Sequence, residues 1–276
     1  MLNATPCFFE INVDLVGRYK KKMKKCALLL AIIFGWLQPL TVHAQKTVTV
    51  AIAANMQFAM EQLKVEFEKE TGIKVELITS SSGKLSAQIA EGAPYDVFVS
   101  ADMKYPQDLY DKGFATGTPK VYAIGQLVLW TSKPGLKPTA DLKQLLSPAI
   151  KKIAVANPKT APYGVAAEET LKYYKLYDGL KDKLVYGESI GQTQQFIETQ
   201  AADIGFIAKS QVLAAEMKGR GAWVEIPGNA YTPIRQGAVI LKHGKDTNNA
   251  AAGTFYAYIF SDAAQQIFKK FGYIVN

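Results

Sequence analysis

The stretch TVTVAIAANMQFAMEQLKVEFEKETGIKVELITSSSGKLSAQIAEGAPYDVFVS, residues 47–100, decides the fold class. Residues 47–53 alternate and are rich in β-branched side chains, which predicts a strand. Asn55 follows as a candidate N-cap, and apolar residues then recur at the three- and four-residue spacing of an amphipathic helix. Strands over 74–79 and 96–100, separated by a short helix, complete a β-α-β-α-β order. This order predicts a parallel sheet with right-handed crossovers.

The pattern restarts in the second half of the chain. Strands are predicted over 153–156, 183–186, 203–208 and 237–241, and helices are predicted to begin near Pro162, Ser189 and Ser261. Two such units predict an α/β protein of two lobes, each a mainly parallel sheet flanked by helices, joined by two crossing strands. The expected lobes are 45–126 with 238–276, and 127–237; the expected crossings are 121–130 and 232–241.

Residues 1–44 have the features of a secretory signal peptide preceded by an upstream extension. Met23 is followed by two lysines, residues 26–37 are almost wholly apolar, and Val42-His43-Ala44 is a small-x-small cleavage site. The apolar run is too short for a membrane span. We therefore expect translation to start at Met23, cleavage after Ala44, and a mature protein in the periplasm.

Most of the basic charge belongs to this leader. The whole chain carries a formal net charge of +8, and residues 1–44 contain six basic and two acidic side chains, so +4 remains from Gln45 onward. No stripe of Lys and Arg with interleaved aromatics remains there, so we expect no nucleic-acid partner. Both cysteines, Cys7 and Cys26, also lie in the leader. We therefore expect neither a disulfide nor thiolate chemistry in the mature protein.

Enzyme motifs are incomplete. Residues 81–84 (SSGK) fit the S-x-x-K pattern of serine acyl-enzymes, but the companion S-D-N and K-T-G elements are missing. A Ser-His-Asp triad needs a histidine, and His243 is the only one after residue 44. A phosphate loop would need Ser or Thr at Leu85. No His/Cys cluster has metal-ligand spacing, and we expect the adjacent Tyr173 and Tyr174 to be one packed ring and one amphipathic ring. The sequence therefore predicts no enzyme.

Helix starts are the remaining candidates for a site. Asn55, Ser82, Tyr163 and the Ser189–Ile190 peptide each lie where a predicted strand ends and a predicted helix begins. Ligands bind at the carboxyl ends of strands in open parallel sheets, and each helix N-terminus favours an anion by about 0.3–1 kcal/mol. The alternative is that each of these residues only caps its own helix. In that case Ser81 or Ser82 caps the short helix that follows the strand over 74–79. Two ends converging from each lobe would bind a small anion without any cation.

Four motifs together resemble the periplasmic molybdate-binding proteins of ABC uptake systems. They are VAIAANMQFAM (50–60), SSSGKLSAQIAEGAPYDVFVSAD (80–102), VANPKTAPYGVAAEETL (155–171) and FKKFGY (268–273). The similarity runs in order from about Val48 to the C-terminus. It implies a type II periplasmic binding protein, a monomer that holds a tetrahedral oxyanion between its lobes and delivers it to an inner-membrane ABC permease. It implies no cofactor and no direct protein ligand to molybdenum.

The resemblance also implies the ligand residues. The family's first-loop donor falls on Asn55 with Ala54 beside it, its serine hydroxyl on Ser82 with Ser81 beside it, and its two helix-start backbone amides on Tyr163 and Ile190. One branch of the family adds a tyrosine hydroxyl where this chain has Ala208, so that donor is missing. Glu188, close to Ile190, is expected to face solvent.

The expected function is therefore capture of molybdate, or of tungstate about as well, by neutral hydrogen-bond donors. Two alternatives stay open. The first keeps the fold and changes the ligand to sulfate or a small organic anion. The second is a secreted serine hydrolase that uses Ser81 or Ser82 with Lys84.

Overall fold

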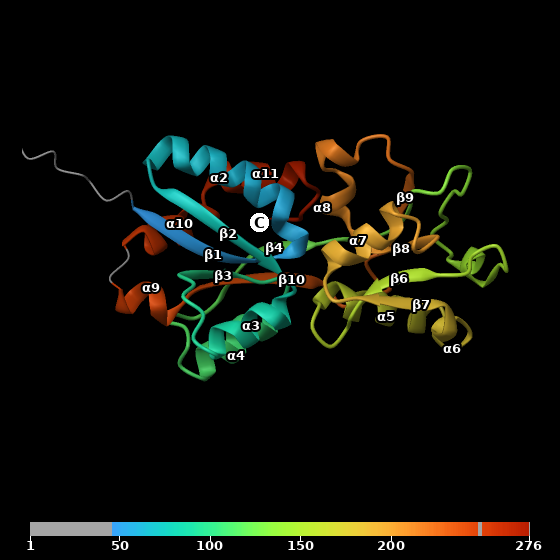
Figure 1. The fold of residues 1–276 in the computed structure, drawn as a ribbon, viewed down its shortest axis with the longest axis horizontal. Coiled ribbons are helices and arrows are strands. Elements are labelled where there is room, and N and C mark those ends of the chain that lie inside the picture. Colours follow the sequence, from blue (N-terminus) through green and yellow to red (C-terminus); the bar gives the residue numbers. More distant parts are fainter. Residues whose placement is uncertain (1–45, 248–249, 276) are drawn as a thin grey trace, which may run out of the picture. The chain divides into compact units, whose positions relative to one another are not determined.

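Residues 47–100 form three parallel strands with helices between them, as predicted (Figure 1). The structure, a computed structural model, describes residues 46–247 and 250–275. The predicted signal peptide, its cleavage site and the proposed start at Met23 lie outside the described residues. No helix in the described part of the chain is long and apolar enough to cross a membrane.

The first sheet contains five strands, four of which run in the same direction. Its order is β2 (Lys74–Ser80), β1 (Thr47–Ala53), β3 (Val97–Val99), β10 (Ile234–Ile240) and β4 (Lys120–Gly125), with β10 antiparallel to both of its neighbours. The helices of this half of the molecule are η1 (Ala54–Met56), α2 (Gln57–Thr71), α3 (Ser82–Ala90), α4 (Lys104–Asp111), α9 (Lys242–Asp246), α10 (Ala250–Ile259) and α11 (Asp262–Lys270).

Side-chain alternation along β1 gives this sheet two apolar faces. Val48, Val50 and Ile52 join the large core, which also contains apolar residues of α2, α10 and α11. Ala51 points to the other face and joins a smaller cluster beneath α3 and α4 that includes Leu85. Because successive side chains on a strand point to opposite faces, one seven-residue segment serves both layers. Figure 1 shows the helices on the two sides of this sheet.

The second sheet repeats this plan. Its order is β7 (Leu184–Gly187), β6 (Ile153–Ala156), β8 (Ile204–Ala208), β5 (Leu127–Thr131) and β9 (Ala222–Glu225), with β5 antiparallel to both neighbours. Its helices are η2 (Lys143–Leu146), α5 (Pro162–Tyr173), α6 (Tyr177–Leu180), η3 (Lys181–Lys183), α7 (Ile190–Glu198), α8 (Lys209–Val212) and η4 (Ala215–Met217). The predicted fold class, two mainly parallel sheets flanked by helices, is confirmed.

The chain crosses between the sheets twice. It leaves the first sheet at Gln126, between β4 and β5, and it returns between β9 and β10. The expected lobe boundary after residue 237 falls inside β10, and the whole of this strand pairs within the first sheet from Ile234 onward. The two-lobed fold is confirmed, the exact bounds of the lobes stay a prediction, and the pairing of β10 assigns this strand to the first lobe.

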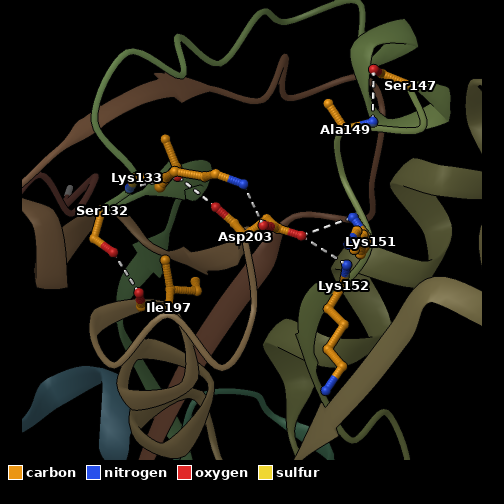
Figure 2. Close-up of polar contacts among 9 residues, drawn as sticks. Ser132, Lys133, Ser147, Ala149, Lys151, Lys152, Ile197 and Asp203 are labelled. Carbon is orange, nitrogen blue, oxygen red and sulfur yellow. Dashed lines mark hydrogen bonds and ion pairs between the residues drawn. The ribbon is translucent and has the colours of Figure 1, made fainter.

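Asp203, immediately before β8, joins three segments at one end of the second sheet (Figure 2). One carboxylate oxygen lies 2.7 Å from Lys133 Nζ, and the other accepts hydrogen bonds from the backbone N–H groups of Lys151 (2.8 Å) and Lys152 (3.0 Å). Partial burial would raise the pKa of Asp203, but the hydrogen bonds from Lys133 and from the two backbone N–H groups outweigh it and hold the pKa below its usual value.

Replacing Asp203 by alanine is therefore expected to lower the free energy of unfolding by about 2 kcal/mol at neutral pH, the loss for hydrogen bonds to a charged group. A carboxylate with a lowered pKa stabilises the fold above about pH 4, its unfolded value, and that contribution disappears as pH falls through the folded value. The parent and variant should thus converge in acid. Denaturant titrations at several pH values measure this, with the exposed Asp182→Ala as control. A constant difference in acid would contradict it.

Candidate ligand-binding site

Six residues predicted for the site line one cavity between the carboxyl ends of the first sheet's strands and the start of two helices packed on the second. The space among the lining residues is about 190 Å³, including the part open to solvent. The lining residues are Ala53, Ala54, Asn55, Ser81, Ser82, Ala101, Ala161, Pro162, Tyr163 and Ile190. The structure therefore brings together the four predicted ligand residues and their neighbours Ala54 and Ser81, which come from segments up to 136 residues apart in the sequence.

The helix starts leave backbone N–H groups without intrahelical acceptors at this cavity. Pro162 is the first residue of α5 and has no N–H, so Tyr163 supplies the first donor of that helix. Ser189 caps α7 as predicted, because its hydroxyl accepts from the Gln192 N–H at 3.2 Å. Ile190 follows as the first residue of α7, and its N–H has no intrahelical acceptor.

The two serines between β2 and α3, Ser81 and Ser82, do not make the expected capping hydrogen bond. Ser81 holds the N-cap position of α3, but its hydroxyl makes no capping hydrogen bond. Ser81 is 4% exposed as a residue, and its buried hydroxyl has no hydrogen-bond partner. Ser82 Oγ instead accepts from the backbone N–H of Ala101 at 3.0 Å. The predicted N-cap position is therefore confirmed at Ser81, but the capping hydrogen bond is absent, and the Ser81 hydroxyl is left available inside the cavity.

Asn55 does not cap a helix either. It lies within the 3₁₀ turn η1, and α2 begins after Met56 with no side-chain cap. Its Nδ2 donates to Gln236 Oε1 (2.9 Å) and to the Tyr273 hydroxyl (3.0 Å). Since both amide hydrogens are used, the side chain has no donor left for a ligand in this arrangement. Its Oδ1 has no hydrogen-bond partner.

A buried polar network that the sequence analysis missed surrounds Asn55. Its carbonyl oxygen accepts from the hydroxyls of Ser210 and Tyr273, both at 2.8 Å. Gln236 Oε1 also accepts from the Tyr122 hydroxyl at 2.8 Å, and Gln236 Nε2 donates to the Tyr163 hydroxyl at 3.1 Å. The available sequence signals were an amide residue, Gln236, beside the apolar run that forms most of β10, and the tyrosine of the FKKFGY motif.

The three tyrosines of this network are buried. Burial raises the pKa of Tyr122 and of Tyr163 well above the usual tyrosine value, and it also raises the pKa of Tyr273. All three phenols therefore stay neutral at physiological pH. Of the described residues that line the cavity, none carries a charge at neutral pH. The cavity thus offers hydroxyls and backbone N–H groups but no cation.

Ala208 ends β8 without a tyrosine, and a glutamine links this position to α7. Gln211 is buried, and its Oε1 accepts from the Ala208 N–H at 2.9 Å. Its Nε2 donates to the carbonyl oxygen of Ile190 (3.2 Å) and to Gln194 Oε1 (2.6 Å). Gln211 therefore fixes the first turn of α7, which carries one of the expected backbone donors.

Direct contacts join the two sides of the cavity mouth. The Gly83 N–H donates to the carbonyl oxygen of Thr160 at 2.9 Å, and the Tyr105 hydroxyl donates to that of Lys159 at 3.1 Å. Glu188 faces solvent as expected, with 75% of its side chain exposed, and it lies 3.5 Å from Lys84 Nζ. Exposed ion pairs of this kind contribute little, so the two hydrogen bonds are the main polar link.

Two alternatives raised by the sequence, a hydrolase that uses Lys84 and a metal site, can be compared with the described part of the structure. Lys84, the general base of the hydrolase hypothesis, pairs with Glu188 at the surface. No group of three His, Cys, Asp or Glu side chains within residues 46–247 and 250–275 is arranged to hold a metal ion. Tyr174 packs against the core while Tyr173 is 53% exposed, as expected for a packed and an amphipathic ring.

Comparison with known proteins gives consistent matches over the whole described chain. The family model of the bacterial extracellular solute-binding proteins matches residues 48–274. A molybdate-binding protein ModA of Azotobacter vinelandii is 42% identical over 82% of this chain and 89% of its own length. That of Rhodobacter capsulatus is 35% identical over 94% of this chain and 99% of its own. The solved structure of the Azotobacter vinelandii periplasmic molybdate-binding protein superposes with a TM-score of 0.78 at 40% identity, covering 83% of this chain and 99% of that one.

Proposed function

Because the chain belongs to the bacterial extracellular solute-binding protein family, we propose that it captures molybdate, and tungstate about as well, in the periplasm and delivers it to an ABC permease. The observation that carries the proposal is the cavity itself. Its walls combine the starts of α5 and α7 with two serines, one of which has an unpartnered hydroxyl, and none of the described lining residues has a charged side chain. The close relatives named for molybdate support the choice of ligand.

A neutral site of this kind suits an oxyanion that is to be released again. A bound dianion loses its water contacts, and aimed donors must replace them. We assign this role to the hydroxyls of Ser81 and Ser82 and to the backbone N–H groups of Asn55, Tyr163 and Ile190. The Asn55 side chain then acts through the network and not on the ligand. In this proposal the protein is a monomer that needs no cofactor, performs no reaction and loses its leader after Ala44.

Calorimetric titration of residues 45–276, which form one compact unit, with molybdate, tungstate, sulfate and phosphate tests the proposal. We expect one-to-one binding of the first two alone. Hydrogen phosphate carries a proton that a donor-rich site leaves unpaired, at a cost of about 1–3 kcal/mol. Heat from sulfate alone would overturn the choice of ligand. Binding of phosphate would indicate that Asn55 Oδ1, the buried acceptor without a partner, faces the ligand.

The two serines are expected to respond differently to truncation. Ser81→Ala and Ser82→Ala should each weaken molybdate binding by about 1–3 kcal/mol, the cost of losing a donor to a charged acceptor. That range corresponds to about 5- to 150-fold in Kd. Only Ser82→Ala should also lower the free energy of unfolding, because it leaves the buried Ala101 N–H unpaired.

Calorimetry combined with thermal unfolding of the ligand-free variants separates the two effects. Ser86→Ala, on the same helix but outside the cavity, is the matched control. Unchanged affinity in either variant would remove that serine from the site.

A further inference from the structure

Gln236 does not line the cavity, yet it touches two residues that do. It lies on β10 and is fully buried, with 0% of its surface exposed. Its Oε1 accepts from Asn55 Nδ2 at 2.9 Å, and its Nε2 donates to the Tyr163 hydroxyl at 3.1 Å. A buried amide is costly unless it is hydrogen-bonded, so these contacts hold the side chain in one orientation.

A third partner fixes the acceptor end of this amide. The Tyr122 hydroxyl on β4 donates to Gln236 Oε1 at 2.8 Å and also lies 3.1 Å from the carbonyl oxygen of Ser100. Tyr122 is itself buried. Because β4 and β10 are neighbours in the first sheet, the contact with Tyr122 fixes the Gln236 side chain within that sheet, independently of its contacts with the two cavity residues.

The contact to Tyr163 passes from the first sheet to a helix that packs on the second. Tyr163 belongs to α5 and lines the cavity, and its backbone N–H is the donor assigned above to the ligand, while its hydroxyl accepts a hydrogen bond from Gln236. Room for this contact depends on Gly125, the last residue of β4. A Cβ there would overlap both the Tyr163 hydroxyl and Gln236 Nε2. A glycine at position 125, where the chain leaves the first sheet, is therefore required for this hydrogen bond.

We propose that Gln236 is a positioning residue for the oxyanion site, setting η1 through Asn55 and the start of α5 through Tyr163 with a single side-chain amide. This inference rests on the proposed function. Both cavity elements take their position from one group on β10, so the donors that they carry are aligned with each other across the two sheets. Gln236 itself makes no contact with the ligand in this arrangement.

The decisive variants are Gln236→Met and Tyr163→Phe. Tyr163→Phe removes the hydroxyl but keeps the backbone N–H assigned to the ligand. Each variant is expected to raise the Kd for molybdate about tenfold, the lower end of the cost of removing a group that orients a ligand-bearing residue. Since both changes break the same hydrogen bond, the double variant should lose clearly less than the product of the two single losses.

Calorimetric titration with molybdate is run on the parent, the two single variants and the double variant, with Tyr256→Phe as the matched control. Tyr256 is a partly buried tyrosine of α10 outside both the network and the cavity. A purely structural role would lower the melting temperature and leave the Kd of the folded protein unchanged. If Gln236→Met fails to fold, Tyr163→Phe still decides, because its parental Kd would overturn the inference.

The outcomes separate this inference from the proposed function. A parent that binds molybdate, with both single variants at the parental Kd or with losses that multiply fully in the double variant, overturns the positioning role alone. A parent that gives no heat with molybdate overturns the proposed function and the positioning role with it.

Discussion

Replacing Gly83 by alanine is expected to weaken molybdate binding by about 5- to 150-fold without destabilising the ligand-free protein. The new Cβ would lie 2.7 Å from the Tyr105 hydroxyl, 2.9 Å from Thr160 Cα and 3.0 Å from the Thr160 oxygen. Overpacking of this kind costs about 1–3 kcal/mol, which converts to that change in Kd. Thr160 lies across the cavity mouth, so separating the two sides relieves both Thr160 contacts. Separation also frees the Tyr105 hydroxyl from the Lys159 oxygen, so this side chain, on the same side as Gly83, can turn away. The cost therefore falls on the closed, ligand-bound state.

The ligand-free protein should respond in the opposite direction. Alanine is a better helix former than glycine by up to about 1 kcal/mol, and Gly83 lies in the first turn of α3. Calorimetry and thermal unfolding of the same samples would thus show weaker binding together with an unchanged or higher melting temperature. Gly253→Ala on α10, where the added Cβ meets nothing within 4 Å, is the control and should leave the Kd unchanged. A parental Kd for Gly83→Ala would show that the contact between Gly83 and Thr160 plays no part in binding.

The second large effect is expected at alkaline pH, where the buried tyrosines should make the free energy of unfolding fall steeply. An unfolded tyrosine loses its proton near pH 10, whereas burial raises the pKa of Tyr122, Tyr163 and Tyr273 in the folded protein. Above about pH 10 the unfolded state therefore binds fewer protons, and stability falls with rising pH. Each such tyrosine contributes a slope of about 1.4 kcal/mol per pH unit, so the three together give about 4.

Denaturant titrations at several pH values from about 9 to about 12 measure this slope, which develops as the pH passes the usual tyrosine pKa and is complete about one unit above it. Tyr122→Phe and Tyr273→Phe should each reduce the slope by up to about 1.4 kcal/mol per pH unit, while Tyr173→Phe, at an exposed position, serves as the control. A free energy of unfolding that stays level across this range would show that the three phenols ionise as readily in the folded protein as in the unfolded chain.

The fold could be predicted from the sequence because its signals are local. Alternating residues over 47–53 and the apolar spacing after Asn55 indicate a strand and a helix without reference to any distant part of the chain. The rule that parallel strands end at the same edge groups Asn55 with Ser82 and Tyr163 with Ile190, while the meeting of the two pairs at one cavity was implied by the family resemblance. Short elements with weak periodicity, such as β9 and α4, were not predicted.

The roles of individual side chains were harder to predict because distant residues decide them. Asparagine is a favoured helix-capping residue, but the side-chain amide of Asn55 donates instead to Gln236, which lies 181 residues later in the sequence. Ser82 likewise pairs with Ala101 and not with its own helix. Local hydrogen bonds compete with such tertiary partners, and a single sequence does not reveal which partner is closer in space. The signals for the network were Gln236, an amide in a predicted strand region, and Tyr273 of the FKKFGY motif.

The absence of charged groups from the described cavity wall has a consequence for how the cargo travels. With no side chain there that ionises near neutral pH, capture should neither take up nor release a proton, so the calorimetric heat should be the same in buffers of different ionisation enthalpy. The two negative charges of the oxyanion also stay uncancelled, which would lower the formal net charge of the chain from Gln45 onward from +4 to +2. The occupied receptor should therefore focus at a lower isoelectric point than the empty one, and it would present the permease with an altered charge.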